Sequence, residues 1–173
     1  KREIFAKRLE FLVGSEDLGV VKSGEMIRYG DVKINTGSCT LCLSCVGACN
    51  VSALVADKKT NSILFNPSVC TACGYCELSC AEKDTISLEV GKISLKPEFF
   101  TYNELARDEL FACVECGKEF ATKKAVEKIA TIMQPRFGND RVKIKALYCC
   151  ADCKAKLMVQ AQINAMKEDL LNG

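Results

Sequence analysis

Two short runs of cysteine with the same spacing constrain this chain more than any other feature. The first run, CTLCLSCVGAC, places four cysteines within residues 39–49, and the second run, CTACGYCELSC, repeats that spacing within residues 70–80. Disulfides, zinc sites and iron–sulfur clusters all use cysteine, so the spacing has to distinguish between them. The chain has 13 cysteines, and this odd number argues against a fully paired disulfide framework.

The first three cysteines of each run are three residues apart, and this arrangement favours a cuboidal iron–sulfur cluster. A [4Fe–4S] cluster takes four thiolates, and a tight loop in which every third residue points inward supplies three of them. Zinc ribbons instead use pairs of cysteines separated by a long loop. The fourth cysteine of each run is expected to begin a short helix and to point away from its own loop, so it completes the other cluster. The predicted ligand sets are Cys39, Cys42, Cys45 and Cys80 for the first cluster, and Cys70, Cys73, Cys76 and Cys49 for the second.

The residues around the two runs form an internal repeat, which favours one small module with two-fold symmetry. The copies are offset by 31 residues (Cys39 to Cys70), which is too short for two independent domains. Apolar residues alternate in SALVADKKTNSILF, 52–65, and in ISLEVGKISL, 86–95. Each segment therefore predicts a β-hairpin, and the second is expected to turn at its Gly-Lys pair.

These residues resemble the bacterial-type ferredoxins that carry two [4Fe–4S] clusters. The resemblance covers about residues 32–96. It implies the ferredoxin fold, with two hairpins and two short helices around the clusters, and a role in carrying single electrons. One departure concerns the residue after the fourth cysteine, where the family usually has proline and this chain has Asn50 and Ala81. Proline is not a ligand, so the difference bears on the potential and shielding of the clusters rather than on their binding.

Before the first run, the pattern predicts a helix and an interrupted strand. Phe5, Leu9 and Leu12 recur at helical spacing within residues 1–13. Residues 25–34, EMIRYGDVKI, read as strand material interrupted by a Gly-Asp turn.

After Pro97 the composition changes, and the pattern predicts a separate α-rich unit. Thr101 and Glu104 form a capping box that opens a helix to about residue 112. The further expected elements are a helix over about 122–133 stopped by Pro135, a strand over 141–148, and a helix over 151–171 closed by Gly173. The apolar stripes within 126–133 and 159–170 are expected to face a core.

The expected fold class is therefore α+β, a ferredoxin-type two-cluster module of two β-hairpins and short helices followed by an α-rich four-cysteine metal-binding unit. The expected domains are an N-terminal helix and strand extension over 1–37, a 2[4Fe–4S] ferredoxin domain over 38–97, and an α-rich, zinc-binding-like unit over 98–173.

The last five cysteines predict a further metal site. CVEC has the form of a metal knuckle, and CCADC supplies a second pair at the start of a helix, an arrangement that resembles a treble-clef zinc site. The chain has no histidine, so the expected ligands are four cysteines, Cys113, Cys116, Cys150 and Cys153. Cys150 is preferred over Cys149 because of its spacing to Cys153. Structural zinc is favoured, and a single rubredoxin-like iron, a third iron–sulfur cluster, or free or disulfide-linked thiols remain as alternatives.

The predicted function is electron transfer, with the chain relaying single electrons through two clusters to or from a partner oxidoreductase or larger complex. No catalytic constellation or glycine-rich phosphate loop is evident, so the chain is expected to be an electron carrier or subunit rather than an enzyme. The alternative is an assembly protein or a regulatory protein that senses redox state. The net charge of +2 gives no reason to propose nucleic acid as a partner.

The cysteine usage favours a reducing, cytoplasmic location and anaerobic metabolism. No apolar run reaches the roughly 18 residues of a membrane span, and no signal peptide is evident. The chain begins at Lys1 rather than Met, which indicates processing or a piece of a longer protein. The oligomeric state, the redox partner and the direction of electron flow are left open by the sequence.

Overall fold

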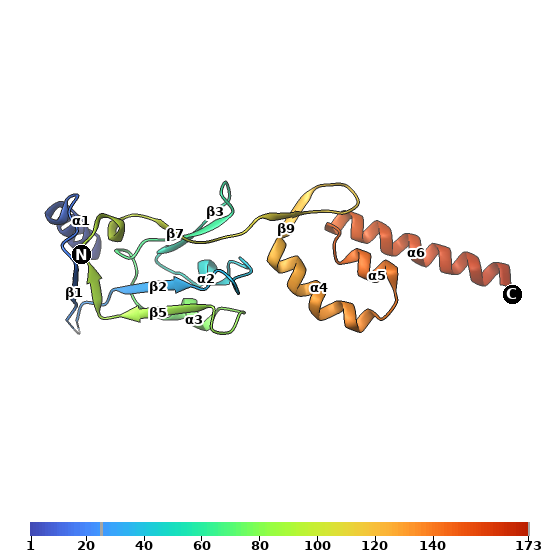
Figure 1. Ribbon diagram of the computed structural model, residues 1–173, viewed down its shortest axis with the longest axis horizontal. Helices are drawn as coiled ribbons and strands as arrows, with labels where there is room; N and C mark the ends of the chain where they lie inside the picture. Colours follow the sequence, from blue (N-terminus) through green and yellow to red (C-terminus); the bar gives the residue numbers. More distant parts are fainter. Residues whose placement is uncertain (25, 173) are drawn as a thin grey trace. The chain divides into compact units, whose positions relative to one another are not determined.

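The chain divides into two compact units, Lys1–Arg107 and Asp108–Gly173. The computed structural model describes residues 1–24 and 26–172, and Figure 1 shows the order of the elements. The expected boundaries after residues 37 and 97 differ from this division, since the N-terminal extension packs within the first unit and the first unit continues to Arg107.

The first unit combines short strands with short helices. Its elements are α1 (Arg2–Val13), β1 (Val20–Lys22), β2 (Gly30–Ile34), α2 (Ser44–Gly47), β3 (Leu54–Asp57), β4 (Ser62–Phe65), α3 (Tyr75–Leu78), β5 (Ile86–Val90), β6 (Lys92–Ser94), a 3₁₀ helix η1 (Pro97–Phe100), and β7 (Asn103–Arg107). The predicted N-terminal helix and the hairpin over 52–65, formed by β3 and β4, are confirmed.

The two cysteine runs share one backbone conformation, as the internal repeat predicts. Leu41 and Leu43 in the first run have φ values of 49° and 61°, and Ala72 and Gly74 at the equivalent positions of the second run have values of 53° and 80°. A one-turn helix then follows in each copy, α2 in the first and α3 in the second. These helices precede the fourth cysteine, so the expectation that the fourth cysteine begins the helix is wrong.

The predicted hairpin over 86–95 is also wrong. β5 pairs antiparallel with β2, whereas β6 pairs with β1 (Figure 1). A single residue, Gly91 with a φ of 84°, separates β5 from β6 and bends the chain without reversing it. Gly30 and Asp31 likewise form no turn, since both lie in β2 opposite Val90 and Glu89. Residue 25, where that expected strand begins, lies outside the described residues.

Residues 101–112 form strands rather than the expected helix. β7 pairs with β4, the strand that also pairs with β3, and this adds a third strand to the sheet. The carboxylate of Glu104 forms an ion pair with Arg107 instead of capping a helix. Pairing along β4 satisfies backbone groups that a strand edge would leave exposed, and it outweighs the local capping signal. This strand extends the first unit beyond residue 97.

Two hydrophobic cores stabilise the first unit. One surrounds the cysteine runs and includes Val32, Ile63 and Phe65. The other lies where α1 meets η1, and its buried side chains are Val13, Tyr29, Ile93, Phe99 and Phe100. The ring of Phe99 meets those of Tyr29 and Phe100 edge-on, with centroids 5.4 and 5.1 Å apart. The N-terminal extension is therefore anchored to the module that carries the cysteine runs.

The second unit consists of β8 (Leu110–Ala112) paired with β9 (Glu119–Thr122), followed by α4 (Lys123–Phe137), α5 (Arg141–Ala146) and α6 (Ala151–Asn172). The predicted strand over 141–148 is wrong. The Asp140 side chain accepts a hydrogen bond from the Lys143 amide and caps α5, so a helix forms despite the alternating pattern.

The other two helices predicted for the second unit are present, although their predicted ends are only partly confirmed. α4 begins at the expected place, where the Thr122 side chain accepts from the Ala125 amide, but it continues past Pro135 to Phe137. The long C-terminal helix is confirmed as α6, and its expected closure at Gly173 lies outside the described residues.

The apolar stripes of α4 and α6 are only partly buried, contrary to expectation. Val126 and Ala130 are buried, whereas Ile129 and Ile132 on α4 are exposed. The expected core face of α6 is exposed at each position, which are Val159, Ile163, Met166 and Leu170. Among the helices that the structure describes, we find none with the length and apolar character needed to cross a membrane.

Phe99→Ala should destabilise the first unit by roughly 3–5 kcal/mol, because it removes a buried ring from an aromatic core. Phe11→Ala is the matched control, since Phe11 lies in the same unit and is 87% exposed. We expect the control to change stability by less than about 0.5 kcal/mol. Anaerobic denaturant unfolding compares the two variants, and equal effects would contradict the assignment of this core.

Candidate metal centres

Each cysteine run forms a loop whose backbone faces inward. The pairs of left-handed residues at Leu41 and Leu43, and at Ala72 and Gly74, turn successive amides toward the space that the loop encloses. The first and third cysteines of each run are buried and the second is exposed. The fourth cysteine of each run is half-buried. Each loop therefore has two buried thiols and one thiol at the surface.

The first site comprises the predicted set Cys39, Cys42, Cys45 and Cys80. Burial raises the pKa of the Cys45 thiol to about 11, and negative charge on Cys39 and Cys42 raises it further. Cys80, from the second run, acts on the same thiol in the same direction. Cys80 thus lies near enough to Cys45 to affect its charge, and its role as the fourth ligand of this site stays a prediction. A multiply charged cation core relieves this mutual repulsion of thiolates.

The second site comprises the predicted set Cys49, Cys70, Cys73 and Cys76. All four line one small pocket. The other lining residues are mainly small or apolar: Val32, Ala48, Val51, Ala53, Leu54, Phe65, Thr71, Gly74 and Leu88. Cys49 comes from the first run and the others come from the second, so this cavity has the donor set and the apolar walls that suit a [4Fe–4S] cluster.

Backbone amides donate to the sulfurs of the second site. The Leu54 amide lies 3.5 Å from Cys49 Sγ, and the Ala72 amide lies 3.4 Å from Cys70 Sγ. Burial raises the pKa of Cys70, while hydrogen bonds from the Ala72 and Gly30 amides oppose this effect. Such donors stabilise negative charge on sulfur, and in cluster proteins they raise the reduction potential.

Gly30 is a site residue that the sequence pattern missed. A Cβ at this position would lie 2.5 Å from Leu88 Cδ1, 3.1 Å from Cys70 Sγ and 3.4 Å from Ala72 Cα. Glycine therefore lets strand β2 approach the second run closely enough for its amide to reach Cys70. The sequence placed this glycine in a turn, because the long-range approach leaves no local signal.

The residues after the fourth cysteines leave the ligand positions intact. Asn50 and Ala81, which stand where the ferredoxin family usually has proline, are both exposed. Their side chains therefore contact solvent rather than the interior of either site.

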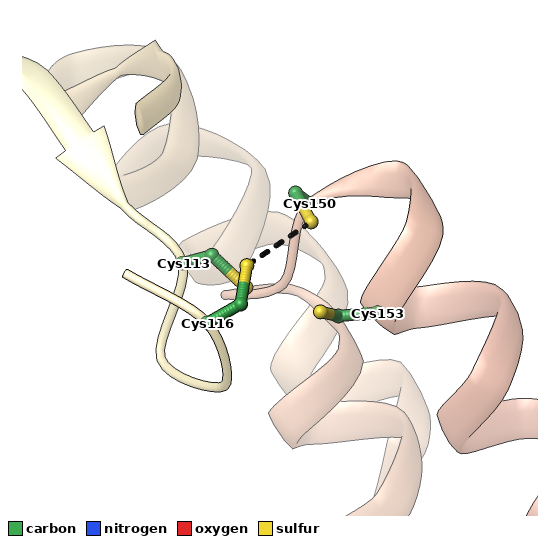
Figure 2. Close-up of side chains that lie close together, drawn as sticks. All are labelled: Cys113, Cys116, Cys150 and Cys153. Atoms are coloured by element: carbon green, nitrogen blue, oxygen red, sulfur yellow. Dashed lines mark hydrogen bonds between the residues drawn. The ribbon is translucent and has the colours of Figure 1, made fainter. Parts of the chain in front are cut away.

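The C-terminal site comprises Cys113, Cys116, Cys150 and Cys153, whose sulfurs all lie within 4.8 Å of one another. Figure 2 shows the first two on the turn after β8 and the other two at the start of α6, with the four sulfurs directed toward a common centre. Cys116 Sγ and Cys150 Sγ are 3.8 Å apart. A tetrahedral ion with metal–sulfur bonds of about 2.3 Å spaces its ligands by about 3.8 Å. The geometry therefore fits a single ion, since a cuboidal cluster would hold its thiolates farther apart.

The electrostatics of the C-terminal site favour cation binding. Burial raises the pKa of Cys113, but hydrogen bonds from the backbone of Cys150, Cys116 and Glu115 outweigh it and lower the pKa to about 6. The pKa of Cys153 is raised, chiefly by hydrogen bonding with Cys116 and Cys150. One thiol thus ionises readily while a neighbour resists ionisation, and a bound divalent cation would favour the thiolate form of all four.

Cys149 lies outside this set of four. Its thiol is buried and donates a hydrogen bond to the Lys145 carbonyl, 3.4 Å away. The structure thus groups Cys150 rather than Cys149 with the other three, in agreement with the spacing argument. Within the described residues, which include every cysteine, no disulfide is present.

Comparison with known proteins identifies the segment that carries the first and second sites. Residues 31–81 match the family model described as a 4Fe-4S dicluster domain. This segment is similar to a 4Fe-4S dicluster domain. The domain implies iron–sulfur clusters, and it begins at β2 and ends just after Cys80.

Three curated relatives share part of the chain. The Hydrogenase-2 operon protein HybA of Escherichia coli O157:H7 is 37% identical over 70 residues, which cover 39% of this chain and 20% of the relative. Protein NrfC of Escherichia coli strain K12 is 29% identical over 106 residues, 59% of this chain and 48% of the relative. The aliphatic sulfonate oxidoreductase, polyferredoxin-like subunit of Pyrococcus furiosus is 44% identical over 39 residues, 22% of each chain. The chain thus spans less than half the length of these relatives.

Gly30→Ala should weaken or abolish loading of the second site, because the added methyl group displaces Leu88 or the Cys70 sulfur. Gly47→Ala is the control, since a Cβ at Gly47 meets no atom within 4 Å. We expect a loss of up to half of the iron and acid-labile sulfide in Gly30→Ala and full content in Gly47→Ala. Full content in both variants would show that the close approach of β2 is dispensable.

Proposed function

We propose that this protein relays single electrons to or from a partner oxidoreductase through two [4Fe–4S] clusters. The observation that carries the proposal is the position of Cys49, which lines one pocket together with Cys70, Cys73 and Cys76 of the second run. The proposed counterpart is Cys80, whose charge acts on Cys45 of the first run. This arrangement, within a 4Fe-4S dicluster domain, is the one expected of a two-cluster ferredoxin module.

The chain holds and shields the two centres. A [4Fe–4S] cluster accepts and releases one electron at a potential that its surroundings set. Apolar walls such as Leu54 and Phe65 limit the access of water to the second site. Cys42 and Cys73 are exposed, so each site has one ligand at the surface where a redox partner can approach. The chain supplies no catalytic group in this proposal and acts as an electron carrier or electron-transfer subunit.

The proposed partner is an oxidoreductase or a larger redox complex. Support comes from the names of two relatives, one a hydrogenase-2 operon protein and the other a polyferredoxin-like subunit of an oxidoreductase. A reducing, cytoplasmic and anaerobic setting is part of the same proposal, because thiol-ligated clusters are readily oxidised in air.

For the C-terminal site we propose structural zinc. Four cysteines from two paired motifs, with sulfurs within 4.8 Å of one another, suit a closed tetrahedral site. A bound ion would join the β8–β9 turn to the first turn of α6 and so stabilise the second unit. A single iron is the competing occupant, because four thiolates serve either metal.

Cys150→Ser should greatly reduce zinc binding, whereas Cys149→Ser should retain close to one zinc per chain. The two cysteines are adjacent and both buried, but only Cys150 lies within the group of four sulfurs. Metal analysis of both variants, together with the thermal unfolding of the second unit, distinguishes them. Equal metal loss in the two variants would contradict the ligand assignment.

The electron-transfer proposal predicts that the anaerobically purified protein accepts about two electrons per chain in reversible one-electron steps. Reductive titration followed by paramagnetic resonance measures this number. Cys49→Ser and Cys73→Ser should disturb the same centre, although they lie in different runs, while Cys80→Ser should disturb the other. Irreversible loss of iron on reduction, or no reduction at accessible potentials, would overturn the proposal.

A further inference from the structure

The guanidinium of Arg2 is held against the backbone of the second site. Arg2 Nη1 donates a hydrogen bond to the carbonyl of Cys70, 2.7 Å away, and Nη2 donates to the carbonyl of Arg28. The central carbon of the guanidinium lies 4.2 Å from the centroid of the Tyr29 ring. Cys70 is a predicted ligand of the second site. A fixed positive charge is therefore hydrogen-bonded to the backbone of a ligand residue.

The surroundings of Arg2 keep this charge in place. Tyr29 is 2% exposed and belongs to the core that also holds Val13, near the other end of α1. The Phe5 ring stacks on Tyr29 with centroids 6.5 Å apart, which fixes the first turns of α1 over the same ring. An arginine side chain stays protonated at all physiological pH values, so its charge cannot be lost by titration.

Nearby carboxylates do not distinguish the two sites, because each has one. At the first site, the Glu82 carboxylate accepts a hydrogen bond from Thr40, and the Glu82 carbonyl lies 3.2 Å from Cys80 Sγ. At the second site, Glu77 follows Cys76 directly, and its carboxylate accepts from the Leu88 amide. Arg2 adds a cation at the second site, held there by its hydrogen bond to the Cys70 carbonyl.

We propose that Arg2 raises the reduction potential of the cluster bound by Cys49, Cys70, Cys73 and Cys76 above that of the other cluster. Reduction adds one electron, and therefore one negative charge, to the bound group. A fixed cation nearby stabilises the added charge, and it does so more effectively in a partly buried site than in water. This inference rests on the proposed function, because it requires both sites to hold redox-active clusters.

The test compares three variants of the full-length protein by anaerobic potentiometric titration. Arg2→Gln should lower one of the two midpoint potentials and leave the other unchanged, whereas Arg2→Lys, which keeps the charge, should restore most of the loss. Arg8→Gln removes the same charge from an exposed position on the same helix and should leave both midpoints unchanged. Unmoved midpoints in Arg2→Gln, or equal shifts of both, would overturn the inference.

A fourth variant assigns the shifted midpoint. Glu82→Gln removes negative charge beside the first site, so it should raise the midpoint that Arg2→Gln leaves unchanged. If the two variants move the same midpoint, the assignment of Arg2 to the second cluster is wrong.

The iron and sulfide content of every variant distinguishes an effect of charge on the midpoint potential from an effect on folding and cluster assembly. If Arg2→Gln loses iron, the titration uses Arg2→Met in its place. The methionine keeps an apolar side chain against Tyr29 and removes the charge. Loss of iron in both variants would show that Arg2 is needed for assembly and would overturn its role in setting potential. A wild-type protein without two reversible one-electron steps would refute the proposed function itself, whereas two such steps with unmoved midpoints would refute the Arg2 inference alone.

Discussion

The proposed exchange of one cysteine between two equivalent loops is the constraint on which the first unit depends. Each loop supplies three thiols, and the one-turn helices α2 and α3 carry the chain to the fourth, which lies with the opposite loop. Neither site is complete without the other run. Two sites that share their ligands in this way tie both copies of the repeat into a single unit, and metal binding then contributes directly to folding.

Local sequence signals were sufficient where the structure is local. The spacing of the cysteines predicted the C-terminal group of four, and alternation predicted the β3–β4 hairpin. Local sequence signals failed where pairing between distant strands determines the secondary structure. The pairing of β7 with β4 outweighed a capping box at Thr101, and Gly91 redirected β6 to β1. Gly30 and Arg2 were missed for the same reason, because each acts through a contact with Cys70 that only the folded chain brings about.

The three candidate metal centres differ in their protein environment. The first and second sites lie in a hydrophobic core and receive backbone amides, an environment in which small electrostatic differences such as the Arg2 charge affect potential. The C-terminal site lies between a turn and a helix start, with sulfurs close enough for a single ion. The first two therefore suit redox cycling, and the third suits a structural staple for a unit with a small core.

The central claim is that the chain carries two four-iron clusters and one single-ion site. The most direct measurement is the content of iron, acid-labile sulfide and zinc per chain in anaerobically purified protein. The account predicts about eight iron, about eight sulfide and about one zinc. About twelve iron without zinc would make the C-terminal site a third cluster, and a content of four iron or fewer would contradict the exchange of ligands between the two runs.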